Sequence, residues 1–445
     1  MTARIALALL SAVFLVWPAP PAETGQVALR EGRRLALSAE DDAFLEDLSR
    51  RAFMFFWEQA DAGTGIIRDR AGTDGSPSAN ASARDIGSIA SIGFGLSGTC
   101  IAAERGWVPR PQVMDRTRRT LQFFAERQTH EHGWFYHFID LHSGARAWSS
   151  ELSSIDTALL LAGVLTVRRC FARDPAIVRY ADTIYRRVDF QWMLAGHPTL
   201  LAHGWKPESG FLAGRWDHYC ELMILYLLGI GSPTHPLPAD SWTAWARPVM
   251  TFQDYTYISG PDPLFVHQYS HAWVDFRGRR ETLPTNTDWF ENSVIATRAH
   301  KAFSSSLSTE FPGYADNVWG ITASDSQQGY VAWGGPPRNP SIDGSVVPAA
   351  AAGSLMLAPD ITLPALRQMH RQFGDRIYKR YGFADAFHPT SGWINPDVIG
   401  INLGITLLSA ENLRSGHVWR WLMQNPEIPR ALDRAGVRLV RTEAR

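Results

Sequence analysis

The sequence predicts an all-α protein with an (α/α)6 barrel fold, in which long loops form a carbohydrate cleft at one end of the barrel. About a dozen segments carry apolar residues at helical spacing. Alternating, strand-like patterns are scarce, and the loops are rich in Gly, Trp and His. No period of about 20–50 residues repeats, which disfavours a solenoid. A multi-layer helical bundle is the alternative architecture.

The bulk composition is that of an ordinary globular protein of 445 residues, with 45% hydrophobic and 20% charged side chains. Because the net charge is −1, neither a nucleic acid nor an anionic membrane is expected as a partner. The 17 tryptophans exceed what packing usually requires. They indicate either a Trp-rich core or flat platforms for sugar rings.

The first residues predict export. A short basic start, an apolar run too short to span a bilayer and a Pro/Ala exit are typical of a secretory signal peptide, which we place at residues 1–22. A polar linker, 23–40, and a barrel domain, 41–440, would follow. We therefore expect a periplasmic or secreted protein with no stable membrane anchor once the signal is removed; a retained anchor is the alternative.

The first half of the domain is predicted to contain amphipathic or buried helices. The segment at 41–60 has acids at its start, and 85–106 is small and apolar all round. A Ser cap opens 149–171, which ends in basic residues, and Pro stands just inside the start of 174–194. The remaining helices are expected at 111–128, within 215–236 from about Asp217, and at 239–250, 288–308, 345–357, 363–373, 401–416 and 417–424. Short strand candidates are 251–259 and 329–335.

Four loop-rich stretches combine aromatic rings with acids, amides and bases: 130–140, 203–221, 265–277 and 317–330. An aromatic face binds the C–H face of a sugar, while Asp, Asn, Arg and His bind its hydroxyls. Such residues are poor at building a core and suited to a binding site. The four stretches together indicate a carbohydrate site.

Hydrolysis of a glycosidic bond needs two carboxyl groups. Asp217 and Glu221 are four residues apart, so a helix would place them on one face. Glu221 stands at an apolar helix head, where burial would raise its pKa and suit it to be the general acid. Asp217 would tune that acid or hold a sugar hydroxyl. The structural alternative is that Asp217 caps the helix and that Glu221 pairs with an arginine.

No cofactor or metal is expected. His267 and His271 have the i, i+4 spacing of a zinc helix, but no Glu follows the first His and the flanking rings suggest a loop. The three cysteines, Cys100, Cys170 and Cys220, lack metal-type spacing. Motifs for acyl, phosphoryl and hydride transfer are missing from the sequence.

A family resemblance is carried by GWFYHFID, SELSSIDTALLLAG, HGWKPESGFLAGRWDHYCELMILYLLGIGSPTHP, PLFVHQYSHAWVDFR, WGITASD and the C-terminal ENLRSG with MQNPEIPRAL. From about residue 42 to 436, the chain resembles the putative glucoamylases, a family that includes endo-β-1,2-glucanases of glycoside hydrolase family 144. The resemblance implies an (α/α)6 barrel and inverting hydrolysis of β-glucan. It also implies that Glu151, Asp156 and Glu221 line the pocket.

The site predicted from the loops and the resemblance has four catalytic candidates, Glu221, Glu151, Asp156 and Asp217. The aromatic platforms would be Trp134, Tyr136, Trp205, Trp216, Trp273 and Trp319, and the hydroxyl-binding side chains His137, Arg215, Gln268, His271 and Asp325.

One departure concerns the second carboxylate. The family usually reads I-D-x-G-P where this chain reads Ile401-Asn402-Leu403-Gly404-Ile405, and Asn cannot ionise. The base has moved, to Asp156 or Asp397, or the specificity differs, or catalysis is weak or lost.

The predicted function is that of an exported, monomeric glycoside hydrolase cleaving β-glucan, in the first place β-1,2-glucan, by endo-type attack with inversion. The alternatives are a non-catalytic or weakly active glucan-binding protein and a polysaccharide lyase on the same barrel with His or Tyr as base.

Overall fold

The computed structural model describes residues 37–440 apart from 261 and 316. The predicted signal peptide, 1–22, and the linker up to residue 36 lie outside the described residues. In the part described, no helix combines the length and the apolar character needed to cross a membrane. The first helix, α1 (Ala39–Glu58), begins within two residues of the predicted start of the barrel domain.

Six largely buried helices form the inner layer of the described chain, and longer amphipathic helices lie outside them. The inner helices are α2 (Ile89–Arg105), α4 (Ser154–Cys170), α6 (Met223–Gly231), α7 (Tyr269–Trp273), α9 (Pro348–Ala352) and α11 (Gly400–Arg414). The outer and closing helices are α1, α3 (Arg110–Glu126), α5 (Pro175–Arg186), α8 (Trp289–Ser306), α10 (Pro359–Phe373), α12 (His417–Met423) and α13 (Glu427–Arg434).

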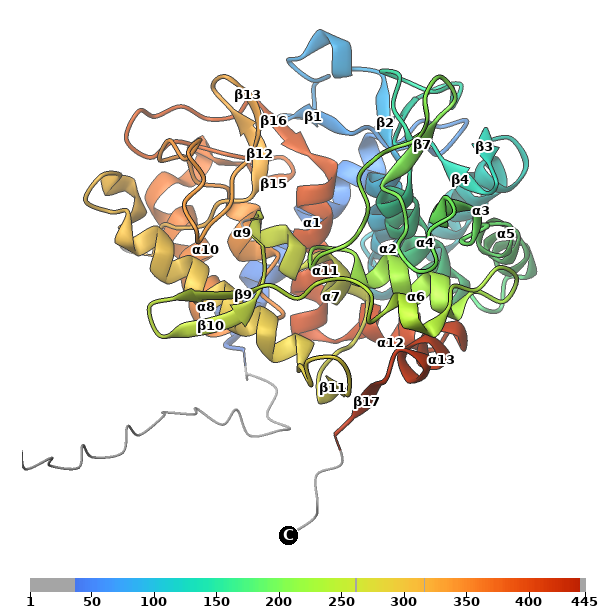
Figure 1. The fold of residues 1–445 in the computed structure, drawn as a ribbon. Helices are drawn as coiled ribbons and strands as arrows, with labels where there is room; N and C mark the ends of the chain where they lie inside the picture. The colour runs from blue at the N-terminus through green and yellow to red at the C-terminus, as the bar shows by residue number, and fades with distance from the viewer. Residues whose placement is uncertain (1–36, 261, 316, 441–445) are drawn as a thin grey trace, which may run out of the picture. The chain divides into compact units, whose positions relative to one another are not determined.

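The inner helices form a closed ring (Figure 1). Helix α2 packs on α4, α4 on α6, α6 on α7, α7 and α9 on α11, and α11 returns to α2. Outer helices pack against this ring, as α1 does on α2 and α11 and α5 does on α4. The protein is therefore the (α/α)6 barrel that the sequence predicts.

The closest approach within the ring joins α2 and α4. A Cβ on Gly93 would meet the Leu159 carbonyl oxygen at 2.2 Å, and one on Gly163 would meet the Gly93 oxygen at 2.1 Å. Only glycine, which has no Cβ, allows the two backbones to come so near. The small, all-apolar composition of 85–106 therefore has a packing cause.

Helix starts follow the expected capping chemistry. The Ser153 hydroxyl accepts from the Asp156 amide at the head of α4, and Asp174 and Asp288 cap α5 and α8 in the same way. Helix α4 begins at Ser154, later than the predicted residue 149, because the preceding residues join a small sheet.

Short strands tie the loops together, several of them at the end of the barrel that is uppermost in Figure 1. The pairs there include β1 (Arg70–Gly72) with β16 (Asp397–Ile399), β2 (Ile86–Ser88) with β5 (Phe138–Asp140), and β12 (Ala323–Ser326) with β13 (Gly329–Ala332). Strands β6 (Leu152–Ser153), β7 (Gly204–Lys206) and β8 (Gly210–Phe211) form a three-stranded sheet. The other pairs are β3 (His130–Glu131) with β4 (Trp134–Phe135), β9 (Val249–Phe252) with β10 (Tyr255–Ile258), β11 (Arg279–Glu281) with β17 (Val437–Leu439), and β14 (Tyr378–Lys379) with β15 (Gly382–Phe383).

Both predicted strand segments contain strands, in the hairpins β9–β10 and β12–β13, but one of the short segments was wrongly predicted as a helix and two short helices were not predicted. Residues 239–250 form only a 3-10 turn at 239–241 before β9. The segment with His271, interpreted as a loop, contains the inner helix α7, and α13 was missed. The secondary structure of these short segments is determined by tertiary packing, because their local sequence pattern is weak.

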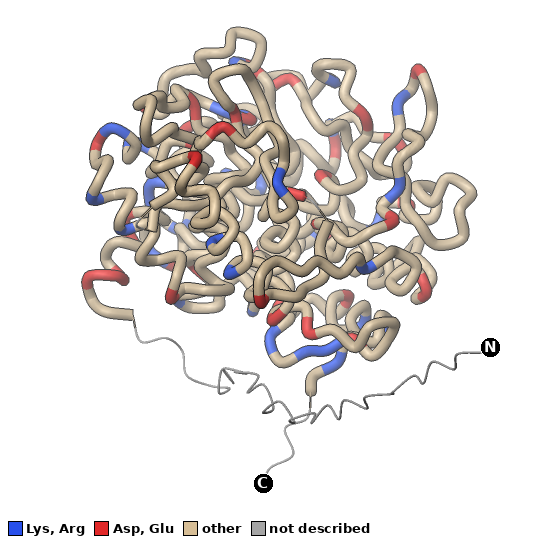
Figure 2. The backbone as a smooth tube through the Cα atoms, turned by 60° about the vertical axis from the view of Figure 1, so that its left-hand side comes forward, with Lys and Arg blue, Asp and Glu red and all other residues tan. Residues whose placement is uncertain are grey.

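Charged residues of both signs are scattered over the backbone (Figure 2), and all three cysteines are free thiols.

The α2–α4 contact gives a stability prediction. Gly163→Ala would drive a methyl group into the rigid backbone of α2, so we expect a loss of about 2–3 kcal/mol in the free energy of unfolding. Urea denaturation followed by circular dichroism measures it. Gly63→Ala is the matched control, because the nearest neighbouring atom to its new Cβ lies at 3.4 Å. Equal stability of the two variants would contradict the close packing.

Candidate active site

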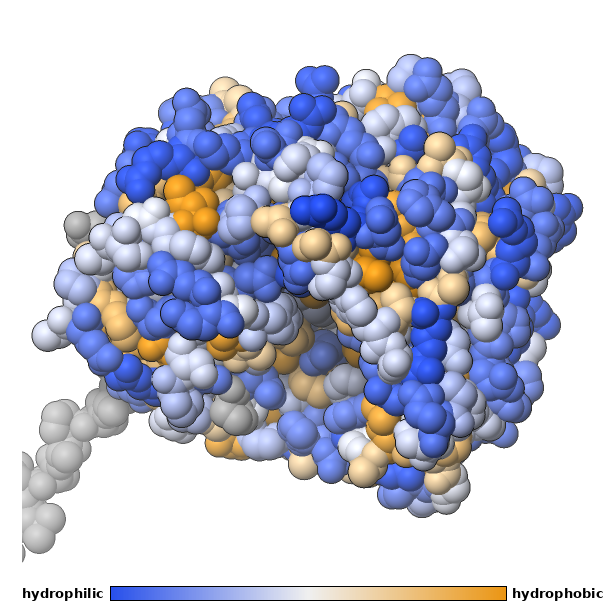
Figure 3. Space-filling view, turned by 90° about the horizontal axis from the view of Figure 1, so that it is seen from above, coloured by the Kyte–Doolittle hydropathy of each residue, from blue (hydrophilic) through white to orange (hydrophobic). Residues whose placement is uncertain are grey.

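The inner helices begin near one end of the barrel, and the candidate catalytic groups stand at those beginnings. Glu221 precedes α6 by two residues, and Asp156 lies in the first turn of α4. Tyr269 is the first residue of α7, and Asn402 is in the first turn of α11. Viewed from above Figure 1, the molecular surface has a hollow near its centre (Figure 3). These groups define the candidate site.

The backbone of Glu221 is fixed by a hydrogen bond, and its side-chain carboxyl is still partly protonated near neutral pH. The Ser270 hydroxyl donates to its main-chain oxygen at 2.9 Å, which fixes Glu221 against α7. Burial of the carboxyl, assisted by the nearby charges of Asp262 and Asp156, raises the pKa of Glu221 to about 7. This carboxyl is therefore suited to donate a proton, as the sequence predicts.

The predicted partnership of Asp217 with Glu221 was wrong. Residues 217–222 are not helical, and α6 begins only at Met223, because His218 makes an isolated bridge with Ala246, just as the preceding Arg215 does with Ala202. The Asp217 side chain is 57% exposed and contacts the neighbouring His218 at 2.7 Å. Asp262 and Asp156, from other elements, supply the charges that Asp217 was expected to supply.

Glu151, His137 and Asp156 form a compact cluster. His137 Nδ1 lies 3.1 Å from Glu151 Oε1, and its Nε2 lies 3.5 Å from Asp156 Oδ2. Burial alone would lower the pKa of His137, but the charges of Asp156 and Glu151 raise it to about 8. In return, the hydrogen bond from His137 lowers the pKa of Glu151 to about 2. At neutral pH the cluster holds an imidazolium and an ionised Glu151.

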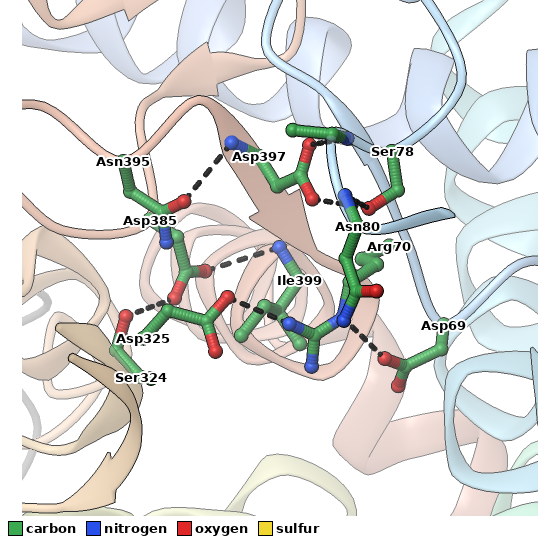
Figure 4. A network of polar contacts seen from close by, with 12 residues as sticks. Asp69, Arg70, Ser78, Asn80, Ser324, Asp325, Asp385, Asn395, Asp397 and Ile399 are labelled. Atoms are coloured by element: carbon green, nitrogen blue, oxygen red, sulfur yellow. Dashed lines mark hydrogen bonds and ion pairs between the residues drawn. The ribbon is translucent and has the colours of Figure 1, made fainter. Parts of the chain in front are cut away.

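A second polar network joins β1 to the β12–β13 hairpin (Figure 4). Arg70 donates to Asp69 at 2.9 Å and to Asp325 at 2.6 Å. The charge of Asp69 also contributes to the raised pKa of His137, which places this network beside the first cluster. Tyr330, paired with Asp325 across the hairpin, is 56% exposed.

Asn402 belongs to the hydrogen-bonding support of a buried carboxyl. Its side-chain amide donates to both oxygens of Asp385 at 3.2 and 3.1 Å and to the Ala323 carbonyl at 3.0 Å. The Ser324 hydroxyl and the Ile399 amide also donate to Asp385. Burial raises the pKa of Asp385 to about 7. Asn402 therefore supplies hydrogen bonds to both oxygens of the buried Asp385 carboxyl.

Asp397, one of the alternative positions for the base, is likewise buried. It accepts from the Ser78 hydroxyl and from the Ala79 amide at 3.0 Å (Figure 4). These bonds join β16 to the loop after β1. Of the two alternative bases, Asp156 is the one that lies beside Glu221.

Three of the six predicted platforms were wrong, because their indoles pack in the core. Trp134 donates to the Asp189 carbonyl and Trp273 to Ser97, and Trp319 is only 1% exposed. Buried rings of this kind stabilise the barrel and cannot stack on a sugar. The half-buried rings that stay candidates are Tyr136, Trp205 and Trp216.

Three predicted hydroxyl-binding residues also have internal roles. Gln268 donates to the Ala350 carbonyl at 2.8 Å, and His271 bonds to Ser293 at 2.9 Å, both inside the core around α7. Arg215 donates to the main-chain oxygens of Leu194 and Leu200. Only His137 and Asp325 of that predicted set lie in the polar clusters described above.

His267 and His271, whose spacing resembles that of a zinc-binding helix, are buried core residues. Burial lowers the pKa values of His267 and His271 to about 3, and both bond to neighbouring hydroxyls. Within residues 37–440, as far as they are described, no group of three or more His, Cys, Asp or Glu side chains is arranged to hold a metal ion.

Sequence analysis missed Arg70, Asp69 and Asp385. Consecutive opposite charges after the apolar pair Ile66–Ile67 were one available signal, and an acid inside YGFADAF was another. Neither motif could show which distant segment completes the network.

The fold and this end of the barrel together define the class of the protein: an (α/α)6 barrel that gathers carboxyl groups of unlike pKa, the arrangement that glycoside hydrolysis uses. A family model described as "Putative glucoamylase" matches residues 214–426. The resemblance predicted from the motifs is therefore confirmed.

Individual relatives agree. The exo β-1,2-glucooligosaccharide sophorohydrolase (non-reducing end) of Parabacteroides distasonis is 25% identical over 435 residues, covering 88% of this chain and 58% of the relative. The chain thus spans little more than half the length of that curated relative. A crystal structure of a putative glucoamylase from Bacteroides caccae has a TM-score of 0.82 at 27% identity, covering 90% of this chain and 100% of the other. The endo-β-1,2-glucanase of Chitinophaga pinensis, in complex with sophorotriose and glucose, has a TM-score of 0.82 at 26% identity, covering 91% and 99%.

The His137 cluster predicts a pH-dependent stability. An unfolded histidine has a pKa of about 6.5, so the value of about 8 in the folded protein means that the cluster stabilises the fold fully below pH 6.5. That contribution is lost as the pH rises through 8. We expect the stability difference between wild type and His137→Gln to shrink by about 1–2 kcal/mol between pH 6 and 9. Urea titrations across this range measure it, and a difference independent of pH would contradict the assignment.

Proposed function

We propose that this protein hydrolyses β-1,2-glucan with inversion of the anomeric centre. The observation that carries the proposal is Glu221, a carboxyl with a pKa of about 7 near Asp156, which His137 links to the ionised Glu151. The relatives support the substrate class, because those of known activity act on β-1,2-linked glucans.

In the proposed mechanism, Glu221 protonates the oxygen of the leaving sugar. Asp156 activates the water, directly or through a sugar hydroxyl, and the water attacks the opposite face of the ring. Glu151 has too low a pKa to be an efficient base, and it keeps His137 charged. His137 and Asp325 would bind hydroxyls of the substrate.

The two alternative functions have less support. A lyase would need a neutral His or an ionised Tyr as base, yet the extra proton of His137 is retained at neutral pH, and burial raises the pKa of Tyr269. Loss of catalysis was one interpretation of Asn402. However, the side-chain amide of Asn402 donates hydrogen bonds to Asp385, and the raised pKa of Glu221 still suits that carboxyl to donate a proton. Export through the predicted signal peptide and a monomeric state belong to the proposal.

The acid assignment is tested by Glu221→Gln. Removal of a general acid costs about 10²–10⁴-fold in kcat, while the affinity for glucan stays nearly unchanged. In the wild type, kcat should fall as the pH rises above 7, because Glu221 loses its proton. Kinetics and calorimetric binding measure both effects. Glu126→Gln, an exposed change at the end of α3, is the control. A fully active Glu221→Gln protein would exclude Glu221 as the acid.

The substrate is tested by incubating the protein with linear and cyclic β-1,2-, β-1,3- and β-1,6-glucans. We expect new reducing ends from β-1,2-glucan, and proton NMR should show the α-anomer first. Product lengths separate endo from exo attack. Initial β-anomers would exclude inversion, unsaturated products would indicate a lyase, and binding without cleavage would indicate a glucan-binding protein.

A further inference from the structure

Trp148 is a large apolar side chain that the barrel leaves outside its core. It is 48% exposed, in contrast to the buried Trp134, Trp273 and Trp319. It lies three residues before Glu151, in the loop between β5 and β6. Exposure of so much apolar surface to water is unfavourable in free energy. Such an exposed ring is typical of a binding site, because a ligand that covers it removes the apolar surface from water.

A continuous set of rings connects Trp148 to the carboxylate cluster. Its ring packs edge-on against Phe138, with centroids 4.8 Å apart. Phe138 stacks on His137 at 3.9 Å, and His137 lies between Glu151 and Asp156. One ring, that of Phe138, therefore separates the exposed indole from the cluster that contains the proposed base.

The backbone that presents Trp148 is strained. Trp148 and Ser149 have φ values of 51° and 50°, in the left-handed region that residues with a Cβ rarely adopt. Two such residues in succession cost free energy and persist only where the surroundings enforce them.

Arg146 enforces this turn. Its guanidinium donates to the main-chain oxygens of Ser149, at 2.7 Å, and Ser150, and it forms a two-pronged bridge with Glu208 at 2.9 and 2.7 Å. It also lies over the ring of Tyr136, 5.0 Å from the centroid. The contacts of Arg146 with the main chain of the turn, with Glu208 and with Tyr136 therefore fix the conformation of the turn and the position of the indole.

We propose that Trp148 is a substrate-binding platform, on which the C–H face of a glucosyl unit stacks next to the Glu151–His137–Asp156 cluster. This inference rests on the proposed function, because it assumes a glucan ligand. The turn held by Arg146 and Glu208 is the positioning device, since it presents the ring before substrate arrives and reduces the ordering cost of binding. A platform that does not touch the reacting atoms binds ground state and transition state alike.

Replacement of the ring tests the platform. Trp148→Ala should raise KM for β-1,2-glucooligosaccharides about 10-fold with kcat nearly unchanged, and Trp148→Phe should recover part of the loss. Val249→Ala, which shortens an exposed apolar side chain on β9, is the matched control. Thermal unfolding checks that each variant folds, and calorimetry in the Glu221→Gln background gives the affinity without turnover.

The positioning role has its own test. Arg146→Lys leaves the indole present but removes the two-pronged bridge, so it should raise KM less than Trp148→Ala does. In the double variant the two effects should not add, because both act through one ring. Additive effects would exclude positioning by Arg146.

The outcomes separate this inference from the proposed function. Unchanged KM and affinity in Trp148→Ala would overturn the platform and leave the hydrolase in place. Trp148-dependent binding of glucan without turnover would overturn hydrolysis and support the platform. A protein that neither binds nor cleaves any glucan of the panel would overturn both.

Discussion

The starts of the inner helices converge on one hollow, and this constraint governs the chemistry of the protein. The first N–H groups of a helix have no partner within it, and they favour negative charge. A ring of such starts tolerates carboxylates that a barrel core would otherwise exclude. The Asp156 carboxylate accepts from the hydroxyl of Ser153, the N-cap of α4, and Asp385 accepts from the amide of Ile399, the N-cap of α11, whereas Glu221 stands just outside the first turn of α6.

The same arrangement explains why neighbouring acids behave differently. Glu151 has a charged partner in His137 and remains ionised, while Glu221 is buried beside like charges and retains its proton. Two carboxyl groups pushed apart in pKa can take different roles at one pH: Glu221 can donate a proton, and Glu151 keeps His137 charged. The difference arises from partners on other segments, so it is a property of the fold rather than of either residue.

Sequence analysis recovered the barrel because its long helices carry strong periodicity and ordinary caps, as at Ser153 and Asp174. The raised pKa of the Glu221 carboxyl and its cause, burial, agree with the sequence prediction, but the predicted neighbour was wrong, because 217–222 does not continue α6. Aromatic loop motifs did not reveal burial: the rings of Trp273 and Trp319 belong to the core, and Trp148, in a turn held by Arg146, was overlooked. Arg70, Asp325 and Asp385 are far apart in sequence, and only the fold brings them together.

The placement of the two proposed reacting groups on separate helices has a stereochemical consequence. The outcome of glycoside hydrolysis depends on the distance between the carboxyl groups. Asp156 stands on α4 and Glu221 at the head of α6, so this distance is set by the lateral packing of two helices rather than by a flexible loop. Under the proposed mechanism, apolar side chains between α4 and α6 that do not contact the sugar would therefore set which anomer is released, and substitutions that repack these two helices would change the distance between the carboxyl groups.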